Sequence, residues 1–137
     1  MKSTELRIGN YLNNPHWDSP KKVTEIRRSE NYPKDASHHI TDDVRCEGTY
    51  LAPIGGFLPV QLTEEWLEKL GFKKTNDNWT IKVGDNDDWL GYCSVYSYED
   101  KWIYSNDISN AGCYTLRSIE FVHQLQNLHF FLNSIEL

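Results

Sequence analysis

The chain has 137 residues and a formal net charge of −6, with 39% hydrophobic and 13% aromatic residues. A chain of this length is one domain or two tightly packed subdomains, and its ring-rich apolar content excludes disorder of the whole chain. The acidic excess lies in the second half, where residues 61–137 carry 12 acidic and 6 basic side chains. Because an acidic surface repels phosphate backbones, nucleic acid is disfavoured as a partner.

The cysteines and the opening residues bear on the cellular compartment. Cys46, Cys93 and Cys113 are odd in number and form no C-x-x-C pair, so no disulfide framework is expected. The opening residues hold no apolar run of signal-peptide length, and no stretch approaches the roughly 20 apolar residues that span a bilayer. We expect a cytoplasmic protein with reduced thiols and no membrane partner.

The first 60 residues are typical of a β-rich subdomain. Residues 5–12 and 22–27 alternate apolar and polar side chains, which predicts two strands. The intervening NNPHWDSP is dense in turn-forming residues, so the strands should form a β-hairpin with a long loop. Residues 29–48 are polar and aperiodic, which predicts a loop with room for one short strand. The hairpin leaves open a small SH3-like barrel.

Helix signals surround the sequence LTEEWLEKLGF at residues 62–72. Thr63 is suited to cap the first free amide groups, and the glutamates after it suit the positive end of the helix dipole. Gly71 can adopt the left-handed conformation that ends a helix, which would place Phe72 against Leu67. The pattern predicts a short helix over residues 64–70.

The second half alternates β-branched and aromatic residues with a period of two. This pattern predicts four strands, at residues 79–83, 91–98, 102–105 and 113–117. A tight turn at residues 98–101 would join the second and third of these strands. That hairpin would place Val95 opposite Tyr104 and Tyr96 opposite Ile103.

The carboxy-terminal residues 119–133 have the spacing of an amphipathic helix. Its predicted apolar stripe consists of Phe121, Leu125, Leu128 and Leu132, widened by Val122 and Phe131. A helix of this length is marginal alone in water, so it should bury that stripe on the sheet. We therefore expect an α+β fold, in which a small antiparallel sheet packs against helices 64–70 and 119–133. Subdomains 1–60 and 61–137 should form one compact unit.

Potential metal ligands gather in two loops, but neither loop has the spacing of a known site. The first set is His38 and His39, with Asp42, Asp43 and Cys46 nearby. Its spacing matches no zinc framework, and a polar loop ordinarily carries such residues as solvated groups. The acidic stretch GDNDDWLG, with Asp85, Asp87 and Asp88, has Leu90 where a calcium loop needs glycine. We expect no metal site and no cofactor.

Nucleophilic and phosphate-binding motifs are also missing from the sequence. It contains no G-x-S-x-G, no phosphate loop and no H-E-x-x-H. Cys93 and His123 could meet as nucleophile and base, yet a buried thiol is ordinary on a strand. His123 and His129 should point to different faces of the last helix. We expect no enzymatic activity, and a metal-dependent enzyme is the least favoured alternative.

Aromatic side chains of the second half are the best candidates for binding. Tyr92, Tyr96 and Tyr98 alternate onto one face of the predicted hairpin, and Trp102 and Tyr104 onto the other. A small sheet cannot cover both faces fully, so one aromatic face should stay partly open as a contact patch, since tyrosine and tryptophan contribute most at interfaces. The alternative is that these rings pack as core and rim. The candidate binding residues are Tyr96, Tyr98, Trp102 and Tyr104.

Three blocks of the sequence resemble a family of small proteins from Bacteroidetes and their phages that has no established activity. The blocks are ELRIGNY at 5–11, LPVQLTEEWLEKLGF at 58–72 and FVHQLQNLHFFL at 121–132. The chain departs from the family in a longer loop at 29–48 and in the two glycines ahead of Pro59. The resemblance implies a phage or mobile-element setting, in which such a protein could bind a host protein, including a defence component, or sequester a nucleotide signal.

These observations favour a non-enzymatic protein-interaction module that acts through its acidic, aromatic second half. Its partner would be a host protein or a second copy of the chain, as a homo-oligomer. The main alternative is a binder of a small ligand such as a nucleotide signal. In that case aromatic rings would stack on the base, and Lys21, Arg27 or Arg28 would hold the phosphate.

Overall fold

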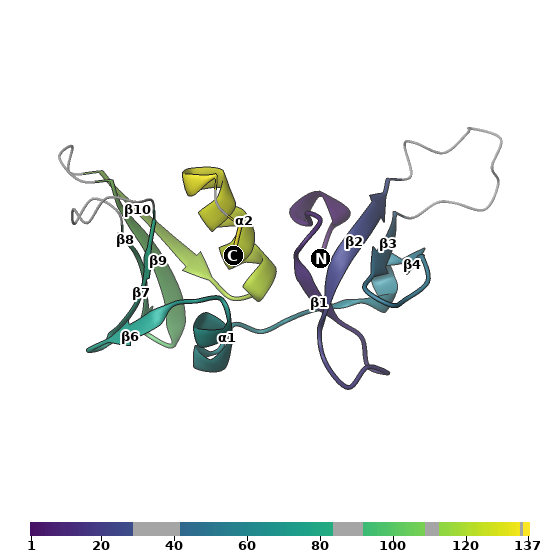
Figure 1. Ribbon diagram of the computed structural model, residues 1–137, viewed down its shortest axis with the longest axis horizontal. Coiled ribbons are helices and arrows are strands. Elements are labelled where there is room, and N and C mark those ends of the chain that lie inside the picture. Colours follow the sequence, from purple (N-terminus) through teal and green to yellow (C-terminus); the bar gives the residue numbers. More distant parts are fainter. Residues whose placement is uncertain (29–41, 84–91, 109–112, 135) are drawn as a thin grey trace. The chain divides into compact units, whose positions relative to one another are not determined.

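The computed structural model describes residues 1–28, 42–83, 92–108, 113–134 and 136–137. Two antiparallel sheets of five strands each and two α-helices build these parts of the chain (Figure 1), which confirms the predicted α+β class. The chain divides into two compact units, Met1–Val60 and Gln61–Leu137, and each unit contains one of the sheets. The sequence predicted one sheet and an amino-terminal hairpin, and in the structure that hairpin is part of a further five-stranded sheet, the sheet of the first unit.

The strands of the first unit form a meander whose last strand returns to the first. They are β1 (Tyr11–Asn13), β2 (Lys21–Arg27), β3 (Asp43–Cys46), β4 (Ala52–Pro53) and β5 (Leu58–Pro59), in the order β4-β3-β2-β1-β5. Two 3-10 turns cover Ser3–Glu5 (η1) and Ile54–Gly56 (η3). β1 and β2 form the predicted hairpin, with Tyr11 opposite Lys22. This strand order neither requires nor excludes the predicted SH3-like barrel. The assignment to the α+β class holds without such a barrel.

The predicted strand over residues 5–12 is wrong for residues 5–10, because β1 begins only at Tyr11. A turn precedes β1, because the backbone amide of Arg7 donates to the side-chain oxygen of Asn10 over 2.7 Å. Gly9 has a φ of 94°, which a regular strand does not allow. The buried Asn10 side chain therefore takes the place of a neighbouring strand as the hydrogen-bond partner of the Arg7 amide, as asparagine does in many turns.

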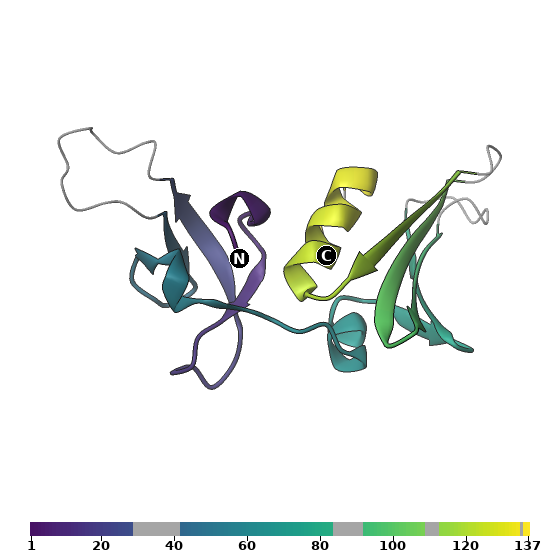
Figure 2. The same ribbon diagram turned by 180° about the vertical axis from the view of Figure 1, so that it is seen from behind.

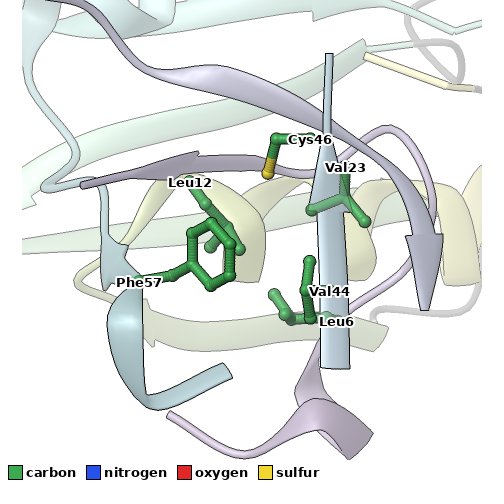
Figure 3. Close-up of a cluster of buried hydrophobic side chains, with 6 residues drawn as sticks. All are labelled: Leu6, Leu12, Val23, Val44, Cys46 and Phe57. Carbon is green, nitrogen blue, oxygen red and sulfur yellow. The ribbon is translucent and has the colours of Figure 1, made fainter. Parts of the chain in front are cut away.

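The core of the first unit is small and aliphatic, with one aromatic ring. Figure 3 shows its six buried side chains in one cluster: Leu6, Leu12, Val23, Val44, Cys46 and Phe57. Trp17 packs on the edge of this cluster, with its ring centroid 5.6 Å from that of Phe57. Cys46 is thus a core residue, which agrees with the prediction of a buried thiol.

The sheet of the second unit is a simple meander. Its strands are β6 (Lys73–Thr75), β7 (Asn78–Lys82), β8 (Tyr92–Tyr98), β9 (Lys101–Ile108) and β10 (Cys113–Ile119), in the order β10-β9-β8-β7-β6. The four predicted strands are present, and the pairs Val95 with Tyr104 and Tyr96 with Ile103 are confirmed. β6 was missed because its three residues are polar and exposed, so they carry no apolar alternation.

The predicted helix over residues 64–70 is confirmed as α1 (Glu64–Lys69). The Thr63 hydroxyl accepts from the backbone amide of Trp66 at the start of the helix. At its end, the amide of Phe72 donates to the carbonyl of Leu67 over 3.0 Å and the amide of Gly71 donates to that of Glu68 over 2.9 Å. These two bonds are the Schellman pattern, and Gly71 has the positive φ of 91° that the pattern needs.

Gly71→Ala is expected to lower the free energy of unfolding by about 1–2 kcal/mol, because an alanine resists a positive φ. A Cβ at this position would lie 3.7 Å from Ile81 Cδ1, an ordinary contact, so backbone strain is the cause. Gly55→Ala is the control, since Gly55 has no positive φ and a Cβ there meets no atom within 4 Å. Urea titrations followed by circular dichroism measure both variants, and equal losses would contradict this explanation.

The carboxy-terminal helix α2 (Val122–Asn133) forms as predicted, but its buried face only partly matches the predicted stripe, of which Val122 and Leu125 are buried. Its buried side chains are Val122, His123, Leu125, Gln126 and His129. Phe131, which the sequence placed in the apolar stripe, is 82% exposed. Figures 1 and 2 show both helices on the same side of the second sheet. This inner face of the sheet carries a phenol and a thiol, and the polar helix residues His129 and Asn133 bond to them, while Leu128 and Leu132 are half-buried.

Candidate functional site

The strand register separates the four predicted binding residues onto two faces of the second sheet. Tyr96 pairs with Ile103, and alternation puts Tyr98 on the same face as Tyr96. Trp102 and Tyr104 point to the opposite face, on which the helices lie. The structure therefore keeps the two tyrosines of β8 together and removes the two aromatic residues of β9 from their surface.

Trp102 and Tyr104 lie on the packed side of the sheet, and the complete burial of Tyr104 removes it from any contact patch, while Trp102 stays a prediction. Tyr104 is completely buried. Trp102 is partly buried, and its Nε1 donates to the Leu62 carbonyl over 3.1 Å. Their rings stabilise the unit, because buried aromatic side chains contribute large apolar areas.

The helix-free face of the sheet holds a shallow hollow, which we call the tyrosine hollow. Its volume is about 280 Å³, and it is lined by Tyr96, Tyr98, Ile103, Arg117 and Ser118. Tyr98 is 60% exposed, while Tyr96 and Ile103 are partly buried. Ser118 of β10 lies opposite Ile103 and shares its face, whereas Arg117 lies opposite Tyr104, so its side chain starts from the other face of the sheet. The hollow is therefore mainly apolar, with the ring of Tyr98 exposed at its side.

Tyr92 lies on the same face as Tyr96 but in a different place. It is 38% exposed and lines a second hollow, of about 320 Å³, together with Lys73 and Lys82. The open face thus carries tyrosine rings at two positions, and the second of them lies beside two lysines.

The opposite face of the sheet contains a polar cluster of Cys93, Tyr104, His129 and Asn133 beneath α2. The Tyr104 hydroxyl and His129 Nδ1 are 3.2 Å apart. Asn133 Nδ2 donates to the Tyr104 hydroxyl over 3.2 Å and to Cys93 Sγ over 3.5 Å. These bonds satisfy the polar groups that the helix and the sheet bury together.

All three titratable members of this cluster are neutral near pH 7. Burial raises the pKa of the Cys93 thiol and of the Tyr104 hydroxyl, and it lowers the pKa of His129 to about 4. A cysteine nucleophile acts as a thiolate, so a thiol with a raised pKa is inert. The cluster brings a thiol, a phenol and an imidazole together, and its chemistry is that of a packed core.

His123 is not the partner of Cys93 that the sequence analysis weighed. It is 2% exposed, and its ring stacks on Phe121 with centroids 5.8 Å apart. His129 takes the position near Cys93 instead, through Asn133 and Tyr104. His123 and His129 thus contact different side chains, although both are buried.

The candidate metal ligands fall partly outside the described residues. His38, His39 and the acidic stretch of Asp85, Asp87 and Asp88 lie outside them. Cys46 is in the core of the first unit, where burial raises the pKa of its thiol to about 11. Within the described ranges, no group of three or more His, Cys, Asp or Glu side chains could hold a metal ion.

The basic residues of β2 make local contacts. Nε of Arg27 lies 2.6 Å from Oε1 of Glu25, which also pairs with Arg45 over 3.0 Å. Nζ of Lys21 lies 5.2 Å from the ring centroid of Trp17, and Nζ of Lys22 lies 5.3 Å from that of Tyr11. Arg27 is therefore neutralised by an acidic neighbour, whereas each lysine lies over a ring.

Several residues of these two sites were missed in the sequence. Ser118 joins the hollow because β10 continues to Ile119, two residues beyond the predicted end of the strand at residue 117. His129 and Asn133 form a polar pair four positions apart, and Asn133 Nδ2 donates to the His129 carbonyl over 3.0 Å. That spacing on a largely apolar helix was the available signal for a buried polar face.

No helix in the described ranges has both the length and the apolar character needed to cross a bilayer. Comparisons with protein-family models, with curated proteins and with solved structures find no match, so the function is argued from the site itself.

Proposed function

We propose that this chain is a non-enzymatic protein-interaction module whose contact surface is the tyrosine hollow. The supporting observation is an apolar hollow of about 280 Å³ on the helix-free face of the sheet, with Tyr98 60% exposed at its side. Tyrosine gives a large contact area for little loss of side-chain entropy, which is why it is enriched at interfaces. The site sits on strands, so its side chains are held in place before a partner arrives.

The lining of the hollow supports one kind of contact. Tyr96 and Ile103 form an apolar floor that suits one bulky side chain of a partner. We therefore propose a protein partner that presents one bulky apolar residue to the hollow.

Tyr96→Ala combined with Tyr98→Ala is expected to leave folding intact and to weaken partner binding at least tenfold. Removing two rings from the centre of an interface typically costs more than 1 kcal/mol for each ring. The partner would be captured on the wild-type chain, identified by mass spectrometry, and its affinity measured with purified components by calorimetry.

Tyr50→Ala is the matched control, because Tyr50 is 93% exposed and belongs to the first unit. It should bind as tightly as the wild type. A double variant with unchanged affinity and an unchanged circular dichroism spectrum would show that the hollow is not the contact surface.

The setting of this function is proposed from the resemblance to the Bacteroidetes and phage family. A host protein, including a defence component, is the proposed partner there, and the cytoplasm is the proposed compartment. Sequestering a nucleotide signal is the second candidate function, and it is supported by the lysines that lie over Trp17 and Tyr11. A thermal-shift screen with nucleotides tests it, because a ligand of the folded state raises the melting temperature.

A further inference from the structure

The helix-free face of the second sheet carries a second hollow besides the tyrosine hollow, which we call the lysine hollow. Its volume is about 320 Å³, and it is lined by Gly71, Lys73, Thr80, Ile81, Lys82 and Tyr92. Lys73 lies opposite Thr80, and Lys82 lies opposite Tyr92. Because opposed and alternate residues of a sheet share a face, both lysines project from the face that carries Tyr96. Both lysine side chains are exposed.

The charged side chains on this face are positive over most of the sheet. From Lys73 to Ser105, the described strand residues that share the face include no carboxylate and three lysines, Lys73, Lys82 and Lys101. Residues 61–137 as a whole carry 12 acidic and 6 basic side chains. The face therefore differs in charge from the rest of its half of the chain, and it is complementary to an acidic surface.

The negative net charge of the chain does not cancel this attraction. At physiological salt, exposed charges more than about 8 Å apart are largely screened from each other. Carboxylates elsewhere on the chain therefore act weakly on a partner at this face, whereas Lys73 and Lys82 act on it at contact distance.

The two hollows lie diagonally across the sheet. The tyrosine hollow is built mainly on β8 and β9, and the lysine hollow mainly on β6 and β7. Four residues along β8, from Tyr92 to Tyr96, span about 14 Å, and two strand spacings across the sheet span about 10 Å. The centres of the two hollows are therefore about 17 Å apart.

Short hydroxyl side chains separate the two hollows. Thr80 and Ser94 lie opposite each other in the row between them, and both are half-buried. The hydroxyl of Thr80 lies 3.3 Å from that of Thr75, so the two hydroxyls bond to each other within the sheet. Because these side chains do not project far, one partner surface can contact both hollows at the same time.

We propose that the protein partner of this face has two anchors, a bulky apolar side chain in the tyrosine hollow and a carboxylate at the lysine hollow, about 17 Å away. The proposal rests on the proposed function, since it specifies the protein that the tyrosine hollow binds. The apolar anchor supplies contact area, and the carboxylate sets the direction in which the partner lies across the sheet. Lys73 and Lys82 would also reject partners that place a cation there.

The test uses a peptide of defined sequence and the isotope-labelled full chain, observed by amide NMR spectra. In the acidic probe, four serine and glycine residues separate a phenylalanine from two glutamates, so its extended length matches the spacing of about 17 Å. Two adjacent glutamates point to opposite sides of an extended chain, and one of them therefore faces the sheet. A lysine probe has two lysines in place of the glutamates, and an alanine probe has alanine in place of the phenylalanine.

The acidic probe should shift the amide signals of both hollows together, with one millimolar dissociation constant. Tyr96 and Ile103 report on the tyrosine hollow, and Lys73 and Lys82 report on the lysine hollow. The lysine probe should bind about fivefold more weakly, because each exposed ion pair contributes modestly. The alanine probe should lose the shifts at Tyr96 and Ile103.

Lys73→Glu combined with Lys82→Glu should reverse this preference, so that the variant binds the lysine probe more tightly than the acidic probe. The matched control is Lys2→Glu combined with Lys69→Glu, which changes the net charge equally at two exposed residues that line neither hollow. It should keep the preference of the wild type. If the first variant fails to fold, salt decides the question: rising salt should weaken the acidic probe on the wild type and should not weaken the lysine probe.

The outcomes separate this proposal from the proposed function. Shifts at Tyr96 and Ile103 that are equal for the acidic and lysine probes would overturn the two-anchor partner and leave the tyrosine hollow as the contact surface. Shifts at Lys73 and Lys82 alone, or at neither hollow, would overturn both proposals. A control variant that loses the preference as fully as the lysine-hollow variant would show that net charge, and not the lysine hollow, selects the acidic probe.

Discussion

Replacing Leu125 by alanine is expected to lower the free energy of unfolding by about 3 kcal/mol. Leu125 is completely buried on α2, and its truncation leaves a cavity between the helix and the sheet. This cost is a large part of the total stability of a small unit. Urea titration of the full chain, followed by circular dichroism, measures it.

Phe131→Ala on the same helix is the control. Phe131 is 82% exposed, so its replacement should change the free energy of unfolding by less than about 0.5 kcal/mol. The sequence periodicity placed both residues in one buried stripe, and the structure separates them. Equal losses for the two variants would favour the stripe predicted from the sequence over the observed docking.

Acid is expected to destabilise the second unit through His129. Its pKa in the folded chain is about 4, below the ordinary value of 6.5, because burial disfavours the imidazolium. The unfolded chain therefore binds a proton that the folded chain does not bind between these pH values. Stability from this residue is present above pH 6.5 and is lost as the pH falls towards 4, by about 3 kcal/mol in total.

His129→Asn tests this pH dependence, because asparagine keeps a polar group near the Tyr104 hydroxyl and does not titrate. The variant should be less stable than the wild type at pH 7, and the difference between the two should shrink as the pH falls from 6.5 to 4. Carboxylates affect both proteins alike, so the difference isolates the histidine. A difference that stays constant with pH would show that His129 is not buried in its neutral form.

The tyrosine hollow and the polar cluster under α2 lie on opposite faces of the same sheet, and the two faces differ in burial. Tyr96 and Tyr98 stay open because no helix covers their face in the described part of the chain. Tyr104, one strand away, is completely buried and bonded to His129. A functional argument from aromatic content alone would treat these three residues as equivalent.

Local interactions explain what the sequence determined by itself. The α+β class, the cap at Thr63, the left-handed Gly71 and the pairing of Val95 with Tyr104 depend on residues close along the chain. Helix caps, terminating glycines and tight hairpins are encoded by such short-range chemistry, so their positions could be predicted.

Only the tertiary structure decided which faces are buried. His129 lies 25 residues after Tyr104, and Asn133 lies 40 residues after Cys93, so no local pattern shows that these groups bond. The polar groups on the inner face of the sheet need partners once they are buried, which favours docking α2 by His129 and Asn133 and leaves Phe131 exposed. Hydrophobic periodicity shows where apolar side chains recur along the chain, but it does not show which buried polar groups must find distant hydrogen-bond partners. For that physical reason it predicted the helix α2 but only part of the face that α2 buries.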